Sequence, residues 1–227
     1  MAKAAQRGTN PRKSKEDRVS AILAAATEVF AETGYQNAKI SDIARRIGVV
    51  EGTVFHYFNT KQRLMARVIE EFYKRITTEV RTGLQGISGT RDSLAYIIHF
   101  HLDVVTRNSR LCGEILRESR GLDGELAGTV SQLNQGYTRH LSEVLKEGIE
   151  TGDIAPDISI AMVRNTIYGS IEHTLWALIN DRLDIDVDAE AKALTELVYR
   201  GIANNTAPDK HEITSLIRSL NRMLGPD

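Results

Sequence analysis

Two short apolar segments separated by a glycine, between Ile40 and Lys61, constrain this chain more than any other feature. In the first segment, apolar side chains recur at helical spacing and share one face: Ile40, Ile43, Ala44 and Ile47. Gly48 can end that helix, and a second helix covers about 52–58. Two short helices joined by a glycine turn are the pattern of a helix-turn-helix, which places its second helix in the major groove of DNA.

The second of these helices needs support from the rest of the fold. Its segment is rich in β-branched and aromatic residues, which are mediocre helix formers. Val54, Phe55 and Phe58 can supply that support by packing inward. On the other face, Thr53 can offer a hydroxyl and a methyl to base edges, and His56 can donate or accept a hydrogen bond there.

Four further residues near this motif suit contacts with the phosphate backbone, which position a protein on DNA without specifying sequence. Tyr57 and Lys61 lie at the end of the second helix, and Arg45 and Arg46 lie on the first. The competing interpretation is that such residues simply pack on the surface or in the core. We favour DNA contact, because their spacing coincides with a docking helix.

The rest of the chain is also predicted to be helical, and no strand pattern competes. Ser14 and Thr60 are predicted N-caps, the second for a long helix over about 61–82. Thr90 and Asp188 are expected to begin later helices. A glycine-rich boundary follows the long helix, at Gly83, Gly86 and Gly89. The later helices are expected at about 91–107, 111–120, 123–150, 158–180, 188–203 and 211–224.

Charge separates the two parts of the chain. Residues 1–61 carry ten Lys or Arg against six Asp or Glu, whereas the whole chain has a net charge of -1. A basic N-terminal part on an acidic remainder suits a DNA-binding unit joined to something else. One cysteine, Cys112, excludes an internal disulfide and fits a reducing cytoplasm. No apolar run approaches the roughly 18 residues that a membrane span needs, so we expect no membrane partner.

The segment between Gly34 and Leu64 resembles the DNA-binding domain of the TetR family of bacterial transcriptional regulators. The resemblance is carried by Gly34-Tyr35, Ile43-Ala44, Gly48-Val49, Gly52-Thr53, Tyr57-Phe58, Lys61 and Leu64. It implies an all-α protein, with a three-helix, homeodomain-like helix-turn-helix domain followed by a helical ligand-binding and dimerisation domain. It also implies a regulator, usually a repressor, that binds a palindromic double-stranded DNA operator as a homodimer.

The expected domains follow from this resemblance. Residues 1–13 form a disordered basic arm, which is either a flexible terminus or a further DNA contact. Residues 14–62 form the helix-turn-helix domain, and residues 63–227 form the effector-binding and dimerisation domain. The helix at about 61–82 links the two. The last helix, at about 211–224, caps the helical bundle or extends the dimer interface.

The chain departs from the family pattern at three positions. A small hydroxyl residue is usual where this chain has Val50, and hydroxyls cap helices far better than valine does. The family often places threonine, a phosphate contact, at the position of Ala38 or Lys39. Here Lys39 can contact phosphate through its charge, whereas Ala38 cannot.

In TetR-like proteins the last two helices of each subunit form the dimer interface. The resemblance therefore assigns the helices at about 158–180 and 189–203 to that interface. The apolar candidates are Ile167, Ile171, Leu175, Leu178, Leu194, Leu197 and Val198. The alternative is that both helices lie deep in the core of the monomer, since both are apolar over a wide arc.

TetR-like regulators usually release DNA when a small molecule enters a pocket between the middle helices. The candidate lining residues here are Phe100, Leu102, Val105, Leu133, Tyr137, His140, Asn165, Tyr168, His173 and Trp176, with His99 as a further polar group. Ordinary core packing is the competing interpretation of each. Four segments are similar to those of family members that sense fatty acyl-CoA, which suggests a long apolar effector: Glu114–Arg120, Tyr137, Glu147-Gly148 and Gly169–Glu172.

An enzyme is the competing class of function, namely an all-helical enzyme or adaptor with an incidental helix-turn-helix. His99 and His101 cannot share a metal ion on a helix, because residues two apart point to different faces. The sequence contains no zinc-protease, phosphate-loop or nucleophile-elbow motif. We therefore expect no catalytic residue, no metal and no cofactor. Steep loss of duplex binding with rising salt would distinguish a DNA-binding regulator from the alternative.

Overall fold

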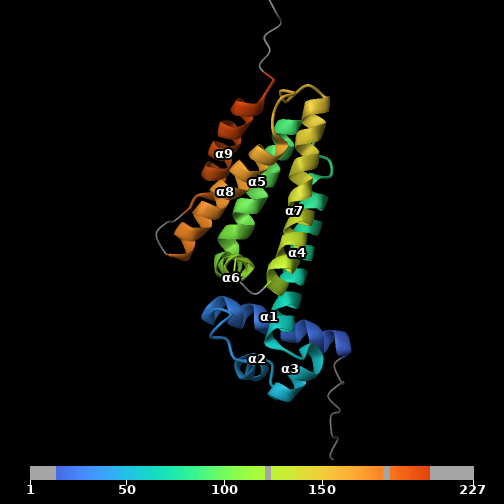
Figure 1. The fold of residues 1–227 in the computed structure, drawn as a ribbon, viewed down its shortest axis with the longest axis vertical. Helices are drawn as coiled ribbons and strands as arrows, with labels where there is room; N and C mark the ends of the chain where they lie inside the picture. Colours follow the sequence, from blue (N-terminus) through green and yellow to red (C-terminus); the bar gives the residue numbers. More distant parts are fainter. Residues whose placement is uncertain (1–13, 121–123, 181–184, 205–227) are drawn as a thin grey trace, which may run out of the picture.

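The computed structural model describes residues 14–120, 124–180 and 185–204, and within them the chain forms nine α-helices (Figure 1). Three helices lie at one end of the molecule: α1 (Lys15–Thr33) and the two short helices α2 (Ile40–Arg46) and α3 (Glu51–Phe58). The others form a helical body above them: α4 (Lys61–Leu84), α5 (Thr90–Arg107), α6 (Ser109–Ser119), α7 (Gly124–Glu150), α8 (Ile160–Ile179) and α9 (Val187–Ile202). The all-α prediction is therefore confirmed.

Side-chain caps fix where several helices begin. Ser14 and Asp17 form the predicted capping box at α1, and the Thr60 hydroxyl accepts a hydrogen bond from the Arg63 N–H at α4. Two predicted starts were wrong. Thr90 lies inside α5, because its hydroxyl donates to the Asp153 carboxylate (2.8 Å) instead of capping the helix. Likewise α9 is capped by the Asp186 carboxylate, not by Asp188.

Gly83 does not interrupt α4, contrary to the prediction. It continues the helix to Leu84, and the positive φ values that end the segment belong to Gly86 and Gly89. Gly83 has a different purpose, since a Cβ atom there would overlap the ring and hydroxyl of Tyr96 on α5. A glycine lets the two helices approach closely at this point.

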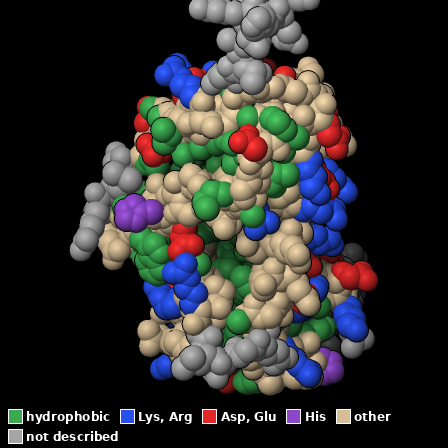
Figure 2. Space-filling model, turned by 45° about the horizontal axis from the view of Figure 1, so that its top comes forward, with side chains coloured by type: hydrophobic (Ala, Val, Ile, Leu, Met, Phe, Trp, Pro, Cys, Tyr) green, Lys and Arg blue, Asp and Glu red, His purple; other side chains and the backbone are tan. Residues whose placement is uncertain are grey.

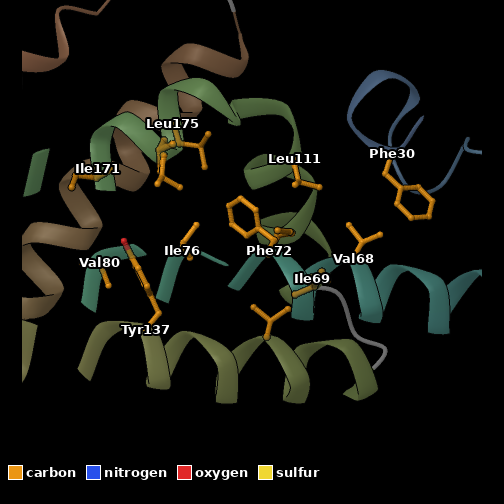
Figure 3. Packing of buried hydrophobic residues seen from close by; sticks show 14 of the residues in the cluster. Phe30, Val68, Ile69, Phe72, Ile76, Val80, Leu111, Tyr137, Ile171 and Leu175 are labelled. Atoms are coloured by element: carbon orange, nitrogen blue, oxygen red, sulfur yellow. The ribbon is translucent and has the colours of Figure 1, made fainter. Parts of the chain in front are cut away.

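The helix α4 joins the two parts of the molecule through one continuous core. Its apolar stripe contacts α1 near Val68, whereas Phe72, Ile76 and Val80 face α7 and α8 (Figure 3). Phe30 of α1 and Tyr137 of α7 thus pack on opposite ends of the same helix (Figure 3). A movement of the helical body can therefore reach the helix-turn-helix through α4.

The helix α9 lies in the part of the helical body that is farthest from α2 and α3 (Figure 1). This helix packs mainly along α5 and only slightly on α8. Its end is joined to the α7–α8 loop by backbone hydrogen bonds from Ala155 N–H to the Ile202 carbonyl and from Asn204 N–H to the Asp153 carbonyl, each 2.9 Å. The predicted arm at 1–13 and the predicted helix at about 211–224 lie outside the described residues.

Replacing Gly83 tests the close approach of α4 and α5. We expect Gly83→Ala to lower the free energy of unfolding by about 1–3 kcal/mol, because Tyr96 must move to admit a methyl group. Gly136→Ala is the matched control: this helical glycine of α7 has open space around it, and the change should raise the free energy of unfolding by about 0.5–1 kcal/mol. Urea denaturation measures both, and equal effects of the two substitutions would contradict the packing argument.

Candidate DNA-binding surface and ligand cavity

The helix-turn-helix is built around a glycine in the left-handed region. Gly48 has φ 68°, and the next residue returns its N–H to the Ala44 carbonyl (3.0 Å), which closes the turn between α2 and α3. Val54 and Phe58 are buried on the inner face of α3. Val50 occupies the N-cap of α3 without a side-chain hydrogen bond, as its departure from the family pattern predicts. The buried inner face therefore anchors α3 to the domain, and the outer face of α3 is left exposed.

The two residues predicted to contact bases, Thr53 and His56, lie together on α3 with Tyr57, a predicted phosphate contact. His56 and Tyr57 follow Thr53 by three and four residues, so the three side chains share one side of the helix. His56 is exposed, Thr53 and Tyr57 are partly exposed, and the His56 and Tyr57 rings meet edge to face at 5.3 Å. This arrangement is suited to a groove of DNA, and the contacts themselves stay a prediction.

Phe55 was predicted to pack in the core, and this was wrong. Its side chain is 42% exposed, unlike the buried Phe58. One helical turn has room for only one of these rings, because Val54 and Phe58 already cover the inner face. An exposed phenylalanine on this face adds an apolar surface next to His56.

The ammonium of Lys61 is bonded within the protein and is not free to contact a phosphate in this structure. It donates to the backbone carbonyls of Gln36 (3.1 Å) and Ala38 (3.0 Å), and lies 4.7 Å from the centre of the Tyr35 ring. Burial lowers the pKa of Lys61. The side chain therefore fastens the start of α4 to the α1–α2 loop, and DNA contact by Lys61 stays a prediction.

The two arginines of α2 also find partners inside the protein. Arg46 pairs with Glu32 (2.6 Å) and Glu28 (2.8 Å) of α1, and these hydrogen bonds raise its pKa. Arg45 pairs with Asp42 on its own helix. Lys39, by contrast, is exposed at the N-cap of α2. Arg46 thus holds α2 against α1, which leaves Lys39 and Arg45 as the more accessible cations of the predicted set.

A buried carboxylate joins this DNA-binding unit to the body. Glu114 of α6 accepts a hydrogen bond from the backbone N–H of Tyr35 (2.7 Å), directly after the end of α1. It also pairs with Arg117, and its neighbour Glu118 accepts from the Gln36 amide (3.2 Å). The sequence alone does not predict this role for Glu114. Its partner lies 79 residues away, so only the α1–α6 contact could reveal the role.

The helical body contains a cavity of about 200 Å³ between α4, α5, α6, α7 and α8. Most of its wall is apolar, and it opens on one face of the molecule, where hydrophobic side chains lie inside a hollow with charged side chains at its edge (Figure 2). Sixteen residues line it: Phe72, Tyr73, Ile76, His101, Val104, Val105, Cys112, Ile115, Leu116, Ser119, Val130, Asn134, Tyr137, Tyr168, Glu172 and Leu175.

Three of the predicted pocket residues line this cavity, namely Val105, Tyr137 and Tyr168. The other seven do not: Phe100, Leu102, Leu133, His140, Asn165, His173 and Trp176. The physical reason is the rotation of the helices about their axes. The cavity face of α5 carries His101, Val104 and Val105, so its neighbours in sequence point elsewhere, with Phe100 stacked on Tyr96. In the same way, α8 turns Asn165 and His173 outward.

Apart from Glu172, the polar groups that line the cavity are neutral. His101 Nδ1 lies 3.0 Å from the Tyr137 hydroxyl, and burial lowers the pKa of His101 to about 4, so the imidazole is neutral at neutral pH. Burial also raises the pKa of the Cys112 thiol to about 12, which keeps it protonated. At the edge, Glu172 of α8 pairs with Arg120 at the end of α6. His99 does not face the cavity and instead pairs with Asp188 (2.7 Å).

Five of the residues predicted for the dimer interface are covered within the single chain: Ile167, Ile171, Leu175, Leu194 and Val198. Leu178 is partly buried, and Leu197 is exposed by 72%. The reason is that α8 and α9 each bury an apolar face in their own chain, which is the alternative interpretation for these residues. Met162 of α8, which is exposed by 66%, and Leu197 of α9 are the large apolar side chains that these two helices leave exposed within the described residues.

Other kinds of site find no support in the residues that the structure describes. Among them, no group of three or more His, Cys, Asp or Glu side chains is placed to hold a metal ion. Within that same part of the chain, no helix has the length and apolar character to cross a bilayer.

Comparison with known proteins agrees with this geometry. Residues 22–68 match the family model for bacterial regulatory proteins of the tetR family, and residues 65–201 match that for the C-terminal region of YsiA-like proteins. The fatty acid metabolism regulator protein of Bacillus subtilis is 27% identical over 85% of this chain and 99% of its own length.

Two solved structures also resemble the chain. One is the transcriptional regulator FadR from Bacillus subtilis in complex with stearoyl-CoA, with 28% identity and a TM-score of 0.73 over 81% of this chain and 98% of that chain. The other is the fatty acid degradation regulator FadR from Bacillus halodurans, with 26% identity and a TM-score of 0.71 over 79% and 97% of the two chains. With its helix-turn-helix and YsiA-like C-terminal region, this chain belongs to the TetR family of DNA-binding transcriptional regulators, which are not enzymes.

Proposed function

We propose that this protein is a dimeric regulator that binds a palindromic operator through α3 and releases it when a long-chain acyl-CoA enters the cavity. The observation that carries the proposal is the position of α6. One side of this helix lines the cavity through Cys112, Ile115 and Leu116, and another side holds the DNA-binding unit through Glu114. A ligand that displaces α6 therefore acts directly on the helix-turn-helix.

The size and lining of the cavity support an acyl chain as the ligand. Ligand pockets usually measure about 300–1,000 Å³, so a cavity of about 200 Å³ is filled by part of a ligand or widens to admit one. Apolar side chains line most of it, which suits a hydrocarbon chain. The related regulator from Bacillus subtilis was solved with stearoyl-CoA, which supports a CoA thioester as the head of that chain.

Release of DNA then follows from a shift between two states. A ligand can move an equilibrium only by its difference in affinity for the two states, and a change from 1:99 to 99:1 needs about 5.5 kcal/mol. Widening the cavity for an acyl chain moves α6 away from α4 and α7. The Glu114 carboxylate carries Tyr35 with it, since the hydrogen bond between them is buried and short.

A dimer gives the protein two recognition helices for two half-sites. In such dimers the half-sites lie about one helical turn apart, roughly 34–36 Å, so binding depends on the distance between the two α3 helices. The exposed side of α8 and α9, with Met162 and Leu197, is the proposed contact between subunits. Repression is the outcome that we propose, because the regulator would leave its operator when acyl-CoA accumulates.

Adding palmitoyl-CoA to the purified protein tests the effector. We expect the melting temperature to rise, because a ligand that binds only the folded state stabilises it by about 2.7 kcal/mol at a hundredfold excess over Kd. We also expect operator affinity to fall by at least about fivefold, the lower end of typical allosteric coupling. Thermal melting and fluorescence anisotropy measure the two effects, and CoA alone is the control. No change in either quantity, across acyl chains of several lengths, would overturn the acyl-CoA proposal.

Substitutions on α3 test how DNA is read. His56→Ala and Thr53→Ala should each change the preferred base at one operator position, at a cost of about 1–3 kcal/mol. Lys61→Ala should weaken binding to all sequences and also lower the melting temperature, because its ammonium holds two carbonyls of the α1–α2 loop. Lys192→Ala, on α9, is the control. Selection from a randomised operator gives the readout, and identical sequence-independent losses for the three test variants would contradict the assigned roles.

Substitutions at Glu114 test whether ligand binding in the cavity changes the affinity for DNA through α6. In Glu114→Ala, we expect the operator Kd to respond to palmitoyl-CoA less than in the wild type, by about 2- to 30-fold, because the hydrogen bond to Tyr35 is lost. Glu114→Gln keeps an acceptor for that N–H and should retain more of the response. Glu118→Ala removes an exposed contact with Gln36 and a charge near Lys61 but leaves the hydrogen bond to Tyr35 in place, so it is the control. An unchanged response in Glu114→Ala would show that coupling takes another route.

A further inference from the structure

Four aromatic residues from four different helices meet on one wall of the cavity. They are Tyr73 of α4, His101 of α5, Tyr137 of α7 and Tyr168 of α8. The His101 ring lies 4.8 Å from Tyr168 and 5.5 Å from Tyr137, and Tyr73 lies 6.3 Å from Tyr137. Tyr137 reaches from α7 toward α4 and α8, with its hydroxyl at the far end (Figure 3). An otherwise apolar cavity therefore contains one compact polar wall.

This wall has hydrogen-bonding capacity that the protein does not use. The Tyr137 hydroxyl and His101 Nδ1 satisfy each other at 3.0 Å. Among the described residues, no hydrogen-bond partner is found for the Tyr73 hydroxyl, the Tyr168 hydroxyl or His101 Nε2. Burial raises the pKa of both tyrosines, so the hydroxyls are protonated donors. The three groups are not among the buried polar atoms that lack a partner, so they face open space in the cavity and are free to bond a ligand that enters it.

The charge of the cavity limits what that ligand group can be. Among the described lining residues, Glu172 is the one Asp, Glu, Lys or Arg, and it is already paired with Arg120. No lysine or arginine lines the wall, and the His101 imidazole is neutral. Arg164 and Arg75 act on Tyr168 and Cys112 through their charge, but neither lines the cavity. A carboxylate placed here would therefore lose its hydration without direct contact with a cation, which costs far more than burying a neutral oxygen.

We propose that Tyr73, His101, Tyr137 and Tyr168 form a hydrogen-bonding subsite for an uncharged oxygen on the acyl part of the ligand, and that this subsite selects against a free carboxylate. The inference rests on the proposed function for the acyl group. Tyr168 and Tyr137 lie one helical turn, about 5–6 Å, from Glu172 and Asn134 at the edge of the cavity. A thioester carbonyl therefore reaches the wall while the CoA part stays at the edge.

Three probes with the same ten-carbon chain test this subsite: 1-decanol, decanoate and decanoyl-CoA. Wild-type protein should bind 1-decanol at least about tenfold more tightly than decanoate, because only the alcohol enters uncharged. Tyr73→Phe and Tyr168→Phe should each lower the affinity for 1-decanol and for decanoyl-CoA by about 2- to 12-fold, which is the effect of losing one net hydrogen bond. Tyr199→Phe, on α9 and outside the cavity, is the matched control and should leave all three affinities unchanged.

Isothermal titration calorimetry measures the affinities, and the melting temperature of each ligand-free variant shows that it folds. Both Phe variants should melt no lower than the wild type, because neither hydroxyl has a protein partner to lose. If 1-decanol alone loses affinity in them, the subsite stands and reads a hydroxyl; if decanoyl-CoA also does, it reads the thioester carbonyl. Unchanged affinities in both variants, or decanoate binding as tightly as 1-decanol, would overturn the subsite.

The same titrations separate this inference from the proposed function. If decanoyl-CoA binds and releases operator DNA equally well in the wild type and both Phe variants, the subsite is overturned and the effector proposal stands. If no acyl-CoA binds the wild type, but 1-decanol binds and is weakened by Tyr168→Phe, the acyl-CoA proposal is overturned and a subsite for an uncharged oxygen stands.

Discussion

The packing of a single helix, α4, is the constraint on which the rest of this structure depends. Its apolar stripe is shared, so that Phe30 of the DNA-binding unit and Tyr137 of the cavity lie against the same helix. Well-packed cores transmit displacement instead of absorbing it, since they contain few voids. A cavity beside Phe72 and Ile76 therefore lies next to the element that also positions α3. The cavity and the helix-turn-helix thus pack against one shared helix.

The sequence predicted the helix-turn-helix well because that signal is local. Helical spacing from Ile40 to Ile47, a glycine turn and the Thr60 cap all act within a few residues, and all are present in the structure. The cavity could be predicted only in part, because its lining depends on the rotation of each helix. On α5, the predicted residues Phe100 and Leu102 each stand one position from His101, which lines the cavity, and a one-residue step turns the side chain by about 100°.

Charged residues were harder still to interpret, because their partners lie far away in the chain. Lys61 and Arg46 have the charge and the position along the chain that suit phosphate contacts. In the fold, however, Lys61 donates to a backbone carbonyl and Arg46 pairs with a carboxylate of α1. Glu114 shows the reverse: its segment resembles that of acyl-CoA sensors, but nothing local predicts its buried contact with Tyr35. Spacing along a helix predicts which residues share a face, but not which distant segment covers that face.

The buried Glu114 also explains why the two ends of the molecule can be coupled without being rigidly fused. A buried carboxylate without partners is costly, so the contact between α6 and the α1–α2 loop is either made well or broken completely. The Tyr35 N–H and Arg117 satisfy the carboxylate in the present state. Because that contact is kept when α6 moves, the α1–α2 loop moves with it, and apolar contacts of a ligand inside the cavity would have to offset the cost of this movement. The junction thereby sets a threshold: a short chain that fills the cavity without moving α6 would bind and leave the DNA-binding unit in place.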